Sequence, residues 1–434
     1  MKTLNPKDSS NYIGLRYMTR FRCIGADCED SCCGEWVVTV DDAHHDALRQ
    51  VMGQTEQGRA EFDAAVQYRI VDGRRIVSLL VQRLDKSCVL LGADKFCTVQ
   101  QRYGEALLPD DCALYPRSVG RLCGRVELSG NLSCPEAARL CLLAPDSTDL
   151  VPVDPSLISR GLVHYTYADS PQDISEAALD DIRDLARYLL ALRERSLDER
   201  LFFLAVFLDS ASLLVGPNAG PRAYVHFAAL LETMRRPEMH DQLSEQLLLA
   251  PALSPPTLFA STMVSQILSA MQQRTVAVRA LFGEVLGASA TDSTSGVQCA
   301  PDGLFAFASA PLAAAAAARR AELSEAYCAR EDVLFERFCQ NHLVRLWPLW
   351  SANLRSYAIG LFLRLAVMRF LLRNHPALRV AEGGSARIDA LAVRVVYSLS
   401  RVLDHEGVIL RGLIESLVET EQDTLANIVS LLRF

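Results

Sequence analysis

The chain has 434 residues, half of them hydrophobic, and a formal net charge of −8 at pH 7. This length exceeds one comfortable hydrophobic core, so we expect two or three domains, and the hydrophobic content argues against disorder. The negative charge argues against nucleic acid as the main partner, because phosphate binding requires a basic surface.

The beginning of the chain and its most apolar stretch give no sign of a membrane segment. The N-terminus lacks the apolar region of a signal peptide. The stretch 357–372 contains Arg364 and Arg369 and is too short to span a bilayer. We therefore expect a cytoplasmic protein with no membrane partner. In that reducing compartment clustered cysteines bind metal more readily than they form disulfides.

Residues 1–150 are expected to form a small cysteine-rich α+β module that binds metal. Ten of the thirteen cysteines lie before residue 142, and four of them crowd into the run from Phe21 to Trp36. Asp72-Gly73 between two β-rich runs, 68–71 and 75–79, predicts a hairpin, and a second extended pair is expected near 122–128. Metal coordination supplies folding energy that a small core cannot.

Residues 151–434 are expected to form an all-helical domain, which makes the protein mainly α. The boundary is marked by prolines at 152 and 155 and by the polar run 168–171. The small polar residues that begin at Gly287 predict a flexible linker near 287–303. Helical periodicity predicts helices at 179–192, 201–214, 224–234, 243–249, 263–286, 321–346, 353–373, 388–405 and 410–432.

The cysteine cluster has the residue types of a metal centre. If Asp27 caps a short helix, Cys28 and Cys32 share one face and Cys33 points to the side, where it could reach a second site. Zinc and iron–sulfur clusters both accept four thiolates, so residue type leaves both open. For two of the later cysteines, Cys123 and Cys141, metal binding and ordinary buried thiols stay equally open. Three cysteines are expected to be ordinary thiols: Cys299, Cys328 and Cys339. The paired histidines 44 and 45 are expected at a solvated helix start.

The cysteine pattern resembles the flagellin lysine-N-methylase family, whose N-terminal part is a CxxCxxCC-type metal-chelating module. The likeness is carried by the run 21–36, the pair Cys88 and Cys97, Cys112-Ala113-Leu114-Tyr115-Pro116-Arg117 and 132–136. It continues more loosely through 197–201, 335–343 and the helix 393–405.

The resemblance implies transfer of a methyl group from S-adenosylmethionine to lysine side chains of flagellin, the protein substrate of the bacterial flagellum. It also implies a [4Fe–4S] cluster, with zinc as the alternative. The metal ligands carried over by position are Cys23, Cys28, Cys32, Cys33, Cys88, Cys97, Cys112 and Cys134. Eight thiols exceed the four that one cluster needs, so some are structural or a second metal is bound.

Lysine methylation requires a neutral amine, so the site must lower the pKa of the amine or accept its proton. Tyr115 and Glu136 lie beside cluster cysteines in the sequence and are the catalytic candidates, and Arg117 is the candidate for the carboxylate of S-adenosylmethionine. A turn that holds Cys112 and a helix-start carboxylate are the simpler interpretations of these residues. The competing functional class is a non-enzymatic metal carrier or a zinc-stabilised adaptor.

Overall fold

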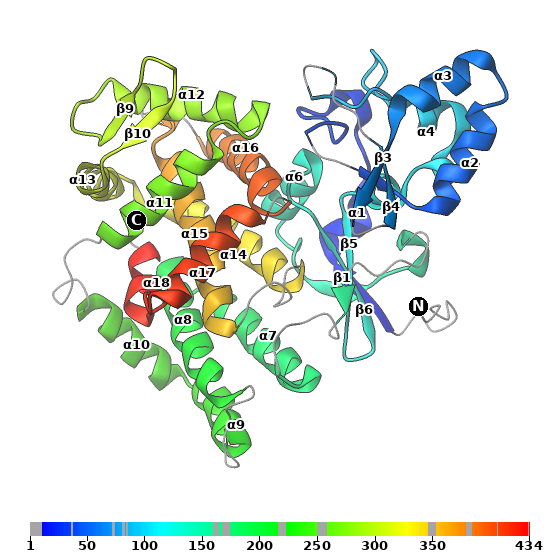
Figure 1. Cartoon of the computed structure of the whole chain (residues 1–434). Helices are drawn as coiled ribbons and strands as arrows, with labels where there is room; N and C mark the ends of the chain where they lie inside the picture. The colour runs from blue at the N-terminus through cyan, green and yellow to red at the C-terminus, as the bar shows by residue number, and fades with distance from the viewer. Residues whose placement is uncertain are drawn as a thin grey trace.

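The computed structural model describes residues 11–35, 38–71, 74–79, 83, 86–158, 165–166, 174–215, 223–249, 258–345, 353–378, 384–405, 407–432 and 434. Figure 1 shows a cysteine-rich N-terminal region on the right and a larger helical body on the left. The protein is mainly α, as predicted, and strands are concentrated in the N-terminal region. None of the described helices has the length and apolar character needed to cross a membrane.

A five-stranded mixed sheet forms the inner part of the N-terminal region. Its strand order is β7-β1-β6-β5-β8, with β1 parallel to β6 and β5 antiparallel to β6. The extended pair predicted near 122–128 is therefore confirmed, because it is the β5–β6 hairpin. The bounds are β1 (Tyr12–Leu15), β5 (Arg117–Leu122), β6 (Arg125–Gly130), β7 (Leu150–Pro152) and β8 (Tyr165–Thr166).

A second, three-stranded sheet lies in the outer part of the N-terminal region, in the order β2-β4-β3. The predicted hairpin is confirmed by the register of β3 and β4, in which Val71 pairs with Arg74. Its turn residues, Asp72 and Gly73, lie outside the described residues. The elements are β2 (Val38–Val40), β3 (Val66–Val71), β4 (Arg74–Leu79), α2 (Asp42–Met52), α3 (Glu56–Ala65), α4 (Thr98–Tyr103), α5 (Asp110–Leu114) and short 3-10 turns at Gly25–Asp27 and Glu105–Leu107.

The helical body extends from α7 to α18. Two predicted helices are each divided in the structure: 263–286 contains parts of α11 and α12, and 410–432 contains parts of α17 and α18. Thr275 starts α12 by accepting a hydrogen bond from the amide of Val278, and such caps begin a new helix. The helices are α7 (Glu176–Leu190), α8 (Leu197–Leu214), α9 (Ala223–Thr233), α10 (Pro237–Leu249), α11 (Leu258–Met271), α12 (Val276–Ala290), α13 (Ser309–Ala321), α14 (Glu325–Arg345), α15 (Leu354–Arg373), α16 (Ser385–Leu403), α17 (Val408–Glu419) and α18 (Leu425–Leu432), with 3-10 turns at Pro155–Leu157 and Pro376–Leu378.

The stretch predicted as a flexible linker, 287–303, contains ordered elements. Residues 287–290 are the last turn of α12, and β9 (Val297–Cys299) pairs with β10 (Phe305–Phe307) in a short ribbon. Between them Asp292 accepts hydrogen bonds from the amide and the hydroxyl of Thr294. A Cβ at Gly296 would meet the amide nitrogen of Leu312 at 2.4 Å, so this turn is packed closely against α13.

Two hydrophobic cores divide the described residues. The larger core contains side chains from β1, β5, β6, α1 (Arg16–Arg20) and α6 (Pro135–Leu143) together with those of the helical body. The smaller core lies among α2, α3, α4 and α5, and Cys88 and Cys97 pack against it. The five-stranded sheet thus shares its core with the helices. The domain boundary expected at residue 150 stays a prediction.

A polar contact fixes the sheet on the helical body. The hydroxyl of Tyr17 in α1 donates to Oδ1 of Asn341 in α14 at 2.8 Å, and Nδ2 of Asn341 donates to the carbonyl oxygen of Gly130 at the end of β6 (3.2 Å). Both side chains are buried. Because buried polar groups require partners, this arrangement favours one docking geometry.

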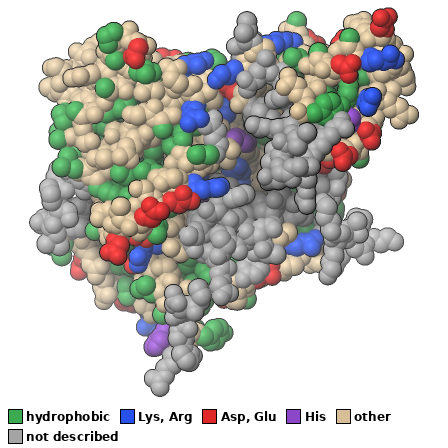
Figure 2. Space-filling view, viewed as in Figure 1, with side chains coloured by type: hydrophobic (Ala, Val, Ile, Leu, Met, Phe, Trp, Pro, Cys, Tyr) green, Lys and Arg blue, Asp and Glu red, His purple; other side chains and the backbone are tan. Residues whose placement is uncertain are grey.

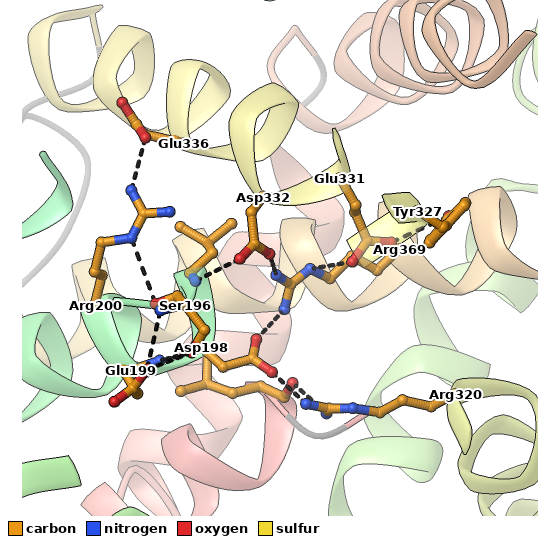
Figure 3. A network of polar contacts seen from close by, with 12 residues as sticks. Ser196, Asp198, Glu199, Arg200, Arg320, Tyr327, Glu331, Asp332, Glu336 and Arg369 are labelled. Atoms are coloured by element: carbon orange, nitrogen blue, oxygen red, sulfur yellow. Dashed lines mark hydrogen bonds and ion pairs between the residues drawn. The ribbon is translucent and has the colours of Figure 1, made fainter. Parts of the chain in front are cut away.

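Buried ion pairs tie the helical body together (Figure 3). Arg369 of α15 donates to Asp198 of α8 at 2.6 Å, and Arg320 of α13 also pairs with Asp198. Glu331 of α14 accepts from Tyr327 (3.2 Å) and lies 3.4 Å from Nε of Arg369. These charges connect four helices, and removing one partner would leave the buried Arg369 or Glu331 with fewer opposite charges.

Candidate metal centre and the residues around it

The first four cysteines lie on a loop without regular helix. The 3-10 turn Gly25–Asp27 separates Cys23 from Cys28, and the amide of Gly25 lies 3.4 Å from the sulfur of Cys23. Asp27 ends this turn and does not cap a helix, so the predicted shared helical face of Cys28 and Cys32 is wrong. The turn is held by local hydrogen bonds, from the amide of Asp27 to the carbonyl of Ile24 and from that of Cys28 to the carbonyl of Gly25.

Cys33 is joined to the next pair of cysteines by backbone pairing. The amide of Cys88 donates to the carbonyl of Cys33 at 2.8 Å, and Gly34 forms a bridge with Ser87. Cys88 and Cys97 flank a tight reversal in which Leu91 and Cys97 form a bridge. The reversal places the two cysteines near each other and against the smaller core.

The last two candidate ligands, Cys112 and Cys134, lie in or directly before short helices. Cys112 lies in α5, which packs against β2, and Cys134 is the residue before α6. Arg139 of α6 pairs with Glu29, the residue after Cys28, and this contact holds the loop of Cys28 beside the start of α6. All thirteen cysteines are free thiols.

The thiols of Cys33, Cys88, Cys97 and Cys112 interact electrostatically as one group. Loss of solvent around the sulfur and repulsion from Cys97, Cys32 and Cys88 raise the pKa of Cys112. Desolvation and the neighbouring Cys97 likewise raise the pKa of Cys88. When these thiols lose their protons, the thiolates repel one another, and a bound cation would relieve that repulsion.

Cys23, Cys28 and Cys134 form a second group of neighbours. Burial, with smaller contributions from Cys28 and Cys32, raises the pKa of Cys134 to about 12. Desolvation is also the main cause that raises the pKa of Cys28, and repulsion from Cys32 and Cys23 adds to it. Cys32 lies between the groups: a hydrogen bond with Cys33 lowers the pKa of Cys32 to about 7 and raises that of Cys33.

The remaining cysteines make other contacts. The amide of Cys123 donates to Glu176 at 2.5 Å, and the buried sulfur of Cys141 lies 3.8 Å from the carbonyl oxygen of Arg337. Both therefore have surroundings of their own outside the two thiol groups. The other three lie in the helical body: Cys299 on β9 and Cys328 on α14, both exposed, and Cys339, buried in α14.

Two side chains near the end of α16 contact residues beside Cys32 and Cys134. Arg401 donates to Asp30 (2.5 Å) and to the carbonyl of Ser31 (2.6 Å), beside Cys32. His405 places Nε2 2.8 Å from the hydroxyl of Ser133, beside Cys134. The looser family likeness at 393–405 includes both residues but did not indicate these contacts, because the partners of each are hundreds of positions away in the chain.

His405 is an uncharged acceptor in this network. Burial lowers its pKa to about 4, with Arg345 and Arg401 adding to the effect. Its Nε2 atom also lies 2.8 Å from Nδ2 of Asn131, so the ring accepts there. The hydroxyl of Ser133 in turn lies 3.0 Å from the hydroxyl of Tyr115. His405, Ser133 and Tyr115 thus form a chain of polar groups from the helical body to the residues beside Cys134.

The three residues suggested for catalysis or cosubstrate binding have different surroundings. Burial raises the pKa of Tyr115 far above its usual value, so the phenol stays protonated and keeps a proton with which it can donate to Ser133. Glu136 lies in the first turn of α6 and pairs with Arg139. The guanidinium carbon of Arg117 lies 5.5 Å from the centre of the Phe21 ring, and burial lowers the pKa of Arg117. The structure therefore accounts for Glu136 as a helix-start carboxylate.

Asp41, His44 and Asp110 place three potential ligand atoms within 4.8 Å of one another. Asp41 caps α2, and its second oxygen lies 2.5 Å from Nδ1 of His44. The neighbouring His45 is buried and lies 2.9 Å from the hydroxyl of Tyr68, so the expected solvated helix start describes only His44. These contacts explain the group as a helix cap with an ion pair.

The molecular surface is hollowed between the helical body and the N-terminal region. In Figure 2 histidine and Lys or Arg side chains lie within this hollow. Basic and histidine side chains at a junction between two parts of a protein are suited to bind an acidic group or to guide a substrate.

Fold and site together define a two-part protein, in which a thiol-rich α+β region is docked on a helical body. Residues 183–431 match the family model of the FliB lysine N-methylase C-terminal domain. This match covers more than half of the chain, so the chain belongs to the FliB lysine N-methylase family.

Similar proteins come from Salmonella. The chain is 28% identical over 155 residues to the lysine-N-methylase of Salmonella typhimurium strain LT2, which covers 36% of each protein. It is also 28% identical over 166 residues to the lysine-N-methylase of Salmonella choleraesuis, again covering 36% of each. It is 26% identical over 138 residues to the flagellar biosynthetic protein FliU of Salmonella muenchen, covering 31% of this chain and 78% of FliU. The alignments thus span well under half of the two methylases. No solved structure matches the chain.

Proposed function

We propose that this protein is a cytoplasmic methyltransferase that moves a methyl group from S-adenosylmethionine to lysine side chains of flagellin. The observation that carries the proposal is the family match, which extends through the helical body from α7 to α18. The names of the similar proteins support lysine methylation and a flagellar context.

The proposed cofactor is a [4Fe–4S] cluster, with zinc as the alternative. The donor set supports a thiolate-bound metal, because eight cysteines gather around the loops 23–33 and 88–97 and their thiolates repel one another. When bound, the metal supplies coordination energy that stabilises the cysteine-rich region, whose own core is small.

The eight thiols are enough for two sites of four ligands each. We assign one site to Cys88 and Cys97, which pack against the smaller core, together with Cys33 and Cys112. The set beside α6 forms the other: Cys23, Cys28, Cys32 and Cys134. Both sets contact the helical body: Arg401 reaches residues next to Cys32 and Cys33, and His405 reaches Ser133, next to Cys134.

Methyl transfer needs a lysine amine that has lost its proton and points at the methyl donor. Tyr115 supports orientation, since its phenol stays protonated and belongs to the polar chain with Ser133 and His405. Arg117 is the candidate partner for the carboxylate of S-adenosylmethionine: within the described part of the chain its buried Nε atom has no hydrogen-bond partner.

A methyl-transfer assay tests the proposal. Anaerobically purified protein is incubated with purified flagellin, a reductant and S-adenosylmethionine labelled on the methyl group, and Cys32→Ser protein serves as the control. We expect label on flagellin lysines with the native chain and little with the variant. No incorporation by protein that contains its iron would favour a metal carrier, and colourless protein containing zinc would favour an adaptor.

A further inference from the structure

Arg401 of the helical body binds the loop that carries the adjacent thiols of Cys32 and Cys33. Its Nη1 atom donates to Asp30 at 2.5 Å, and its Nη2 atom donates to the carbonyl oxygens of Ser31 (2.6 Å) and Gly34 (3.0 Å). Its Nε atom lies 3.8 Å from Glu35. These four partners flank Cys32 and Cys33 on both sides.

An arginine suits this position because its planar guanidinium presents several donors in fixed directions. The carbonyls of Ser31 and Gly34 converge on one nitrogen, which requires the chain between them to curve around the guanidinium. That curvature determines where the sulfur atoms of Cys32 and Cys33 lie. A lysine would preserve the charge but has a single nitrogen with which to reach these acceptors.

The same loop has a second contact with the helical body. Glu35 adopts a positive φ of 67°, which is uncommon for a residue with a side chain. Its carboxylate accepts a hydrogen bond of 2.7 Å from the amide of Val276, the first residue of α12. The loop is therefore held between α16 and α12, and its conformation depends on both helices.

Burial makes the Arg401 contacts strongly interdependent. Arg401 is 6% exposed, and the side chain of Glu35 is 10% exposed. A buried guanidinium that lost its acceptors would be costly, and so would the carboxylates left behind. The loop and the end of α16 are thus expected to keep their relative position or to separate together.

We propose that Arg401 is a positioning residue that holds Cys32 and Cys33 in the arrangement in which they bind metal. The helical body would then set the geometry of the thiol site as well as serve the substrate. This inference rests on the proposed function in taking Cys32 and Cys33 as metal ligands. Its test also includes a measurement on metal-free protein.

Arg394 is a matched control on the same helix. It pairs with Glu284 of α12 through two hydrogen bonds, of 2.6 and 2.7 Å, and its side chain is 29% exposed. Replacing it removes a two-point arginine contact between the same two helices, α16 and α12. Among the described residues Arg394 hydrogen-bonds to Glu284 and makes no hydrogen bond to the loop 30–35.

The first measurement is the rate of hydrogen–deuterium exchange at the backbone amides of the loop 30–35 in the full-length, metal-free chain, followed by mass spectrometry. In Arg401→Gln, we expect these amides to exchange at least about tenfold faster than in the native chain, because the charge-assisted contacts that hold the loop are lost. The amides of residues 95–99 should exchange at the native rate. Arg394→Gln should leave both rates unchanged.

The second measurement uses iron-loaded protein. Arg401→Gln should bind less iron and shift the midpoint potential to more negative values, because a positive charge beside the centre favours the reduced state. Arg401→Lys should keep the native potential but show faster amide exchange in the loop 30–35. A purely structural role would not separate charge from geometry in this way.

Unchanged amide exchange in the loop 30–35 of folded Arg401→Gln would overturn the inference. Equal acceleration at residues 95–99 would also overturn it, by showing that Arg401 only stabilises the whole region. Amide exchange in metal-free protein is independent of methyl transfer. A loop whose exchange depends on Arg401, in a chain that never methylates flagellin, would therefore refute the proposed function and leave the role of Arg401 intact.

Discussion

The amide of Cys88 donates a hydrogen bond of 2.8 Å to the carbonyl of Cys33, which joins the first cysteine loop to the second. This pairing continues at Gly34 and Ser87, so it is a short piece of backbone ladder. A ladder between loops fixes the separation of their side chains even before a metal binds. The thiol site therefore has part of its geometry built into the backbone.

The two proposed four-thiol sites predict distinct losses of metal. Cys112→Ser should remove about half of the iron and sulfide, and Cys28→Ser the other half, because a hydroxyl is a far less acidic ligand than a thiol. Metal analysis and the visible absorption of each variant check this. If either substitution alone removed all the metal from protein that stayed folded, a single shared site would be indicated.

Cys299→Ser is the control for that experiment. Cys299 is exposed on β9, so serine should leave both metal content and stability unchanged. Cys339 is a poorer control because it is fully buried in α14, where a hydroxyl would need a partner. A loss of colour in Cys299→Ser would contradict the assignment of the metal to the N-terminal region.

Removing Asp198 should destabilise the helical body. Asp198→Ala takes away a partner of both Arg369 and Arg320, and we expect the free energy of unfolding to fall by about 3 kcal/mol. Urea denaturation followed by circular dichroism measures this. The exposed pair Arg236 and Glu232 offers the matched comparison, since Arg236→Ala should cost no more than about 0.5 kcal/mol. Equal effects would show that the buried network adds no stability.

The stability of the protein should depend on pH through Asp198. Burial would raise the pKa of Asp198, but Arg369, Arg320 and Arg373 together lower it to about 2. An unfolded aspartate has a pKa of about 3.9, so the contribution is present above that pH and is lost as pH falls through the folded value. It amounts to between about 2 and 3 kcal/mol. Urea denaturation at several values between pH 5 and pH 2 should show a shallower decline for Asp198→Asn than for the native chain; parallel curves would contradict the assignment.

Tyr115 and Glu136 should differ in their effect on methyl transfer. Tyr115→Phe should slow transfer about tenfold without moving the pH–rate profile, because the phenol orients and does not titrate. Glu136→Gln should leave the rate within about twofold of native, since its carboxylate is occupied by Arg139 at the start of α6. Steady-state rates between pH 6 and pH 9 measure both. A slow Glu136→Gln enzyme with an altered pH profile would instead make Glu136 the base.

Much of the fold follows from local signals in the sequence. Alternating hydrophobic residues and an Asp-Gly turn predicted the β3–β4 hairpin, and helical periodicity predicted a mainly α protein. Periodicity was less able to locate the ends of helices, because a threonine cap such as Thr275 interrupts a helix without changing the hydrophobic pattern. The division between α11 and α12 was missed for this reason.

The sequence by itself determined where the cysteines concentrate, since ten of the thirteen precede residue 142, but not which of them lie beside one another. Only the tertiary structure decided what holds them. Arg401 and Asp30 are 371 positions apart, and neither residue has a motif that announces the other. The tertiary structure also decided that the five-stranded sheet and the helices share one core. Contacts between distant segments depend on the packing of whole elements, whereas turns, caps and periodic faces are set by neighbours within a few residues.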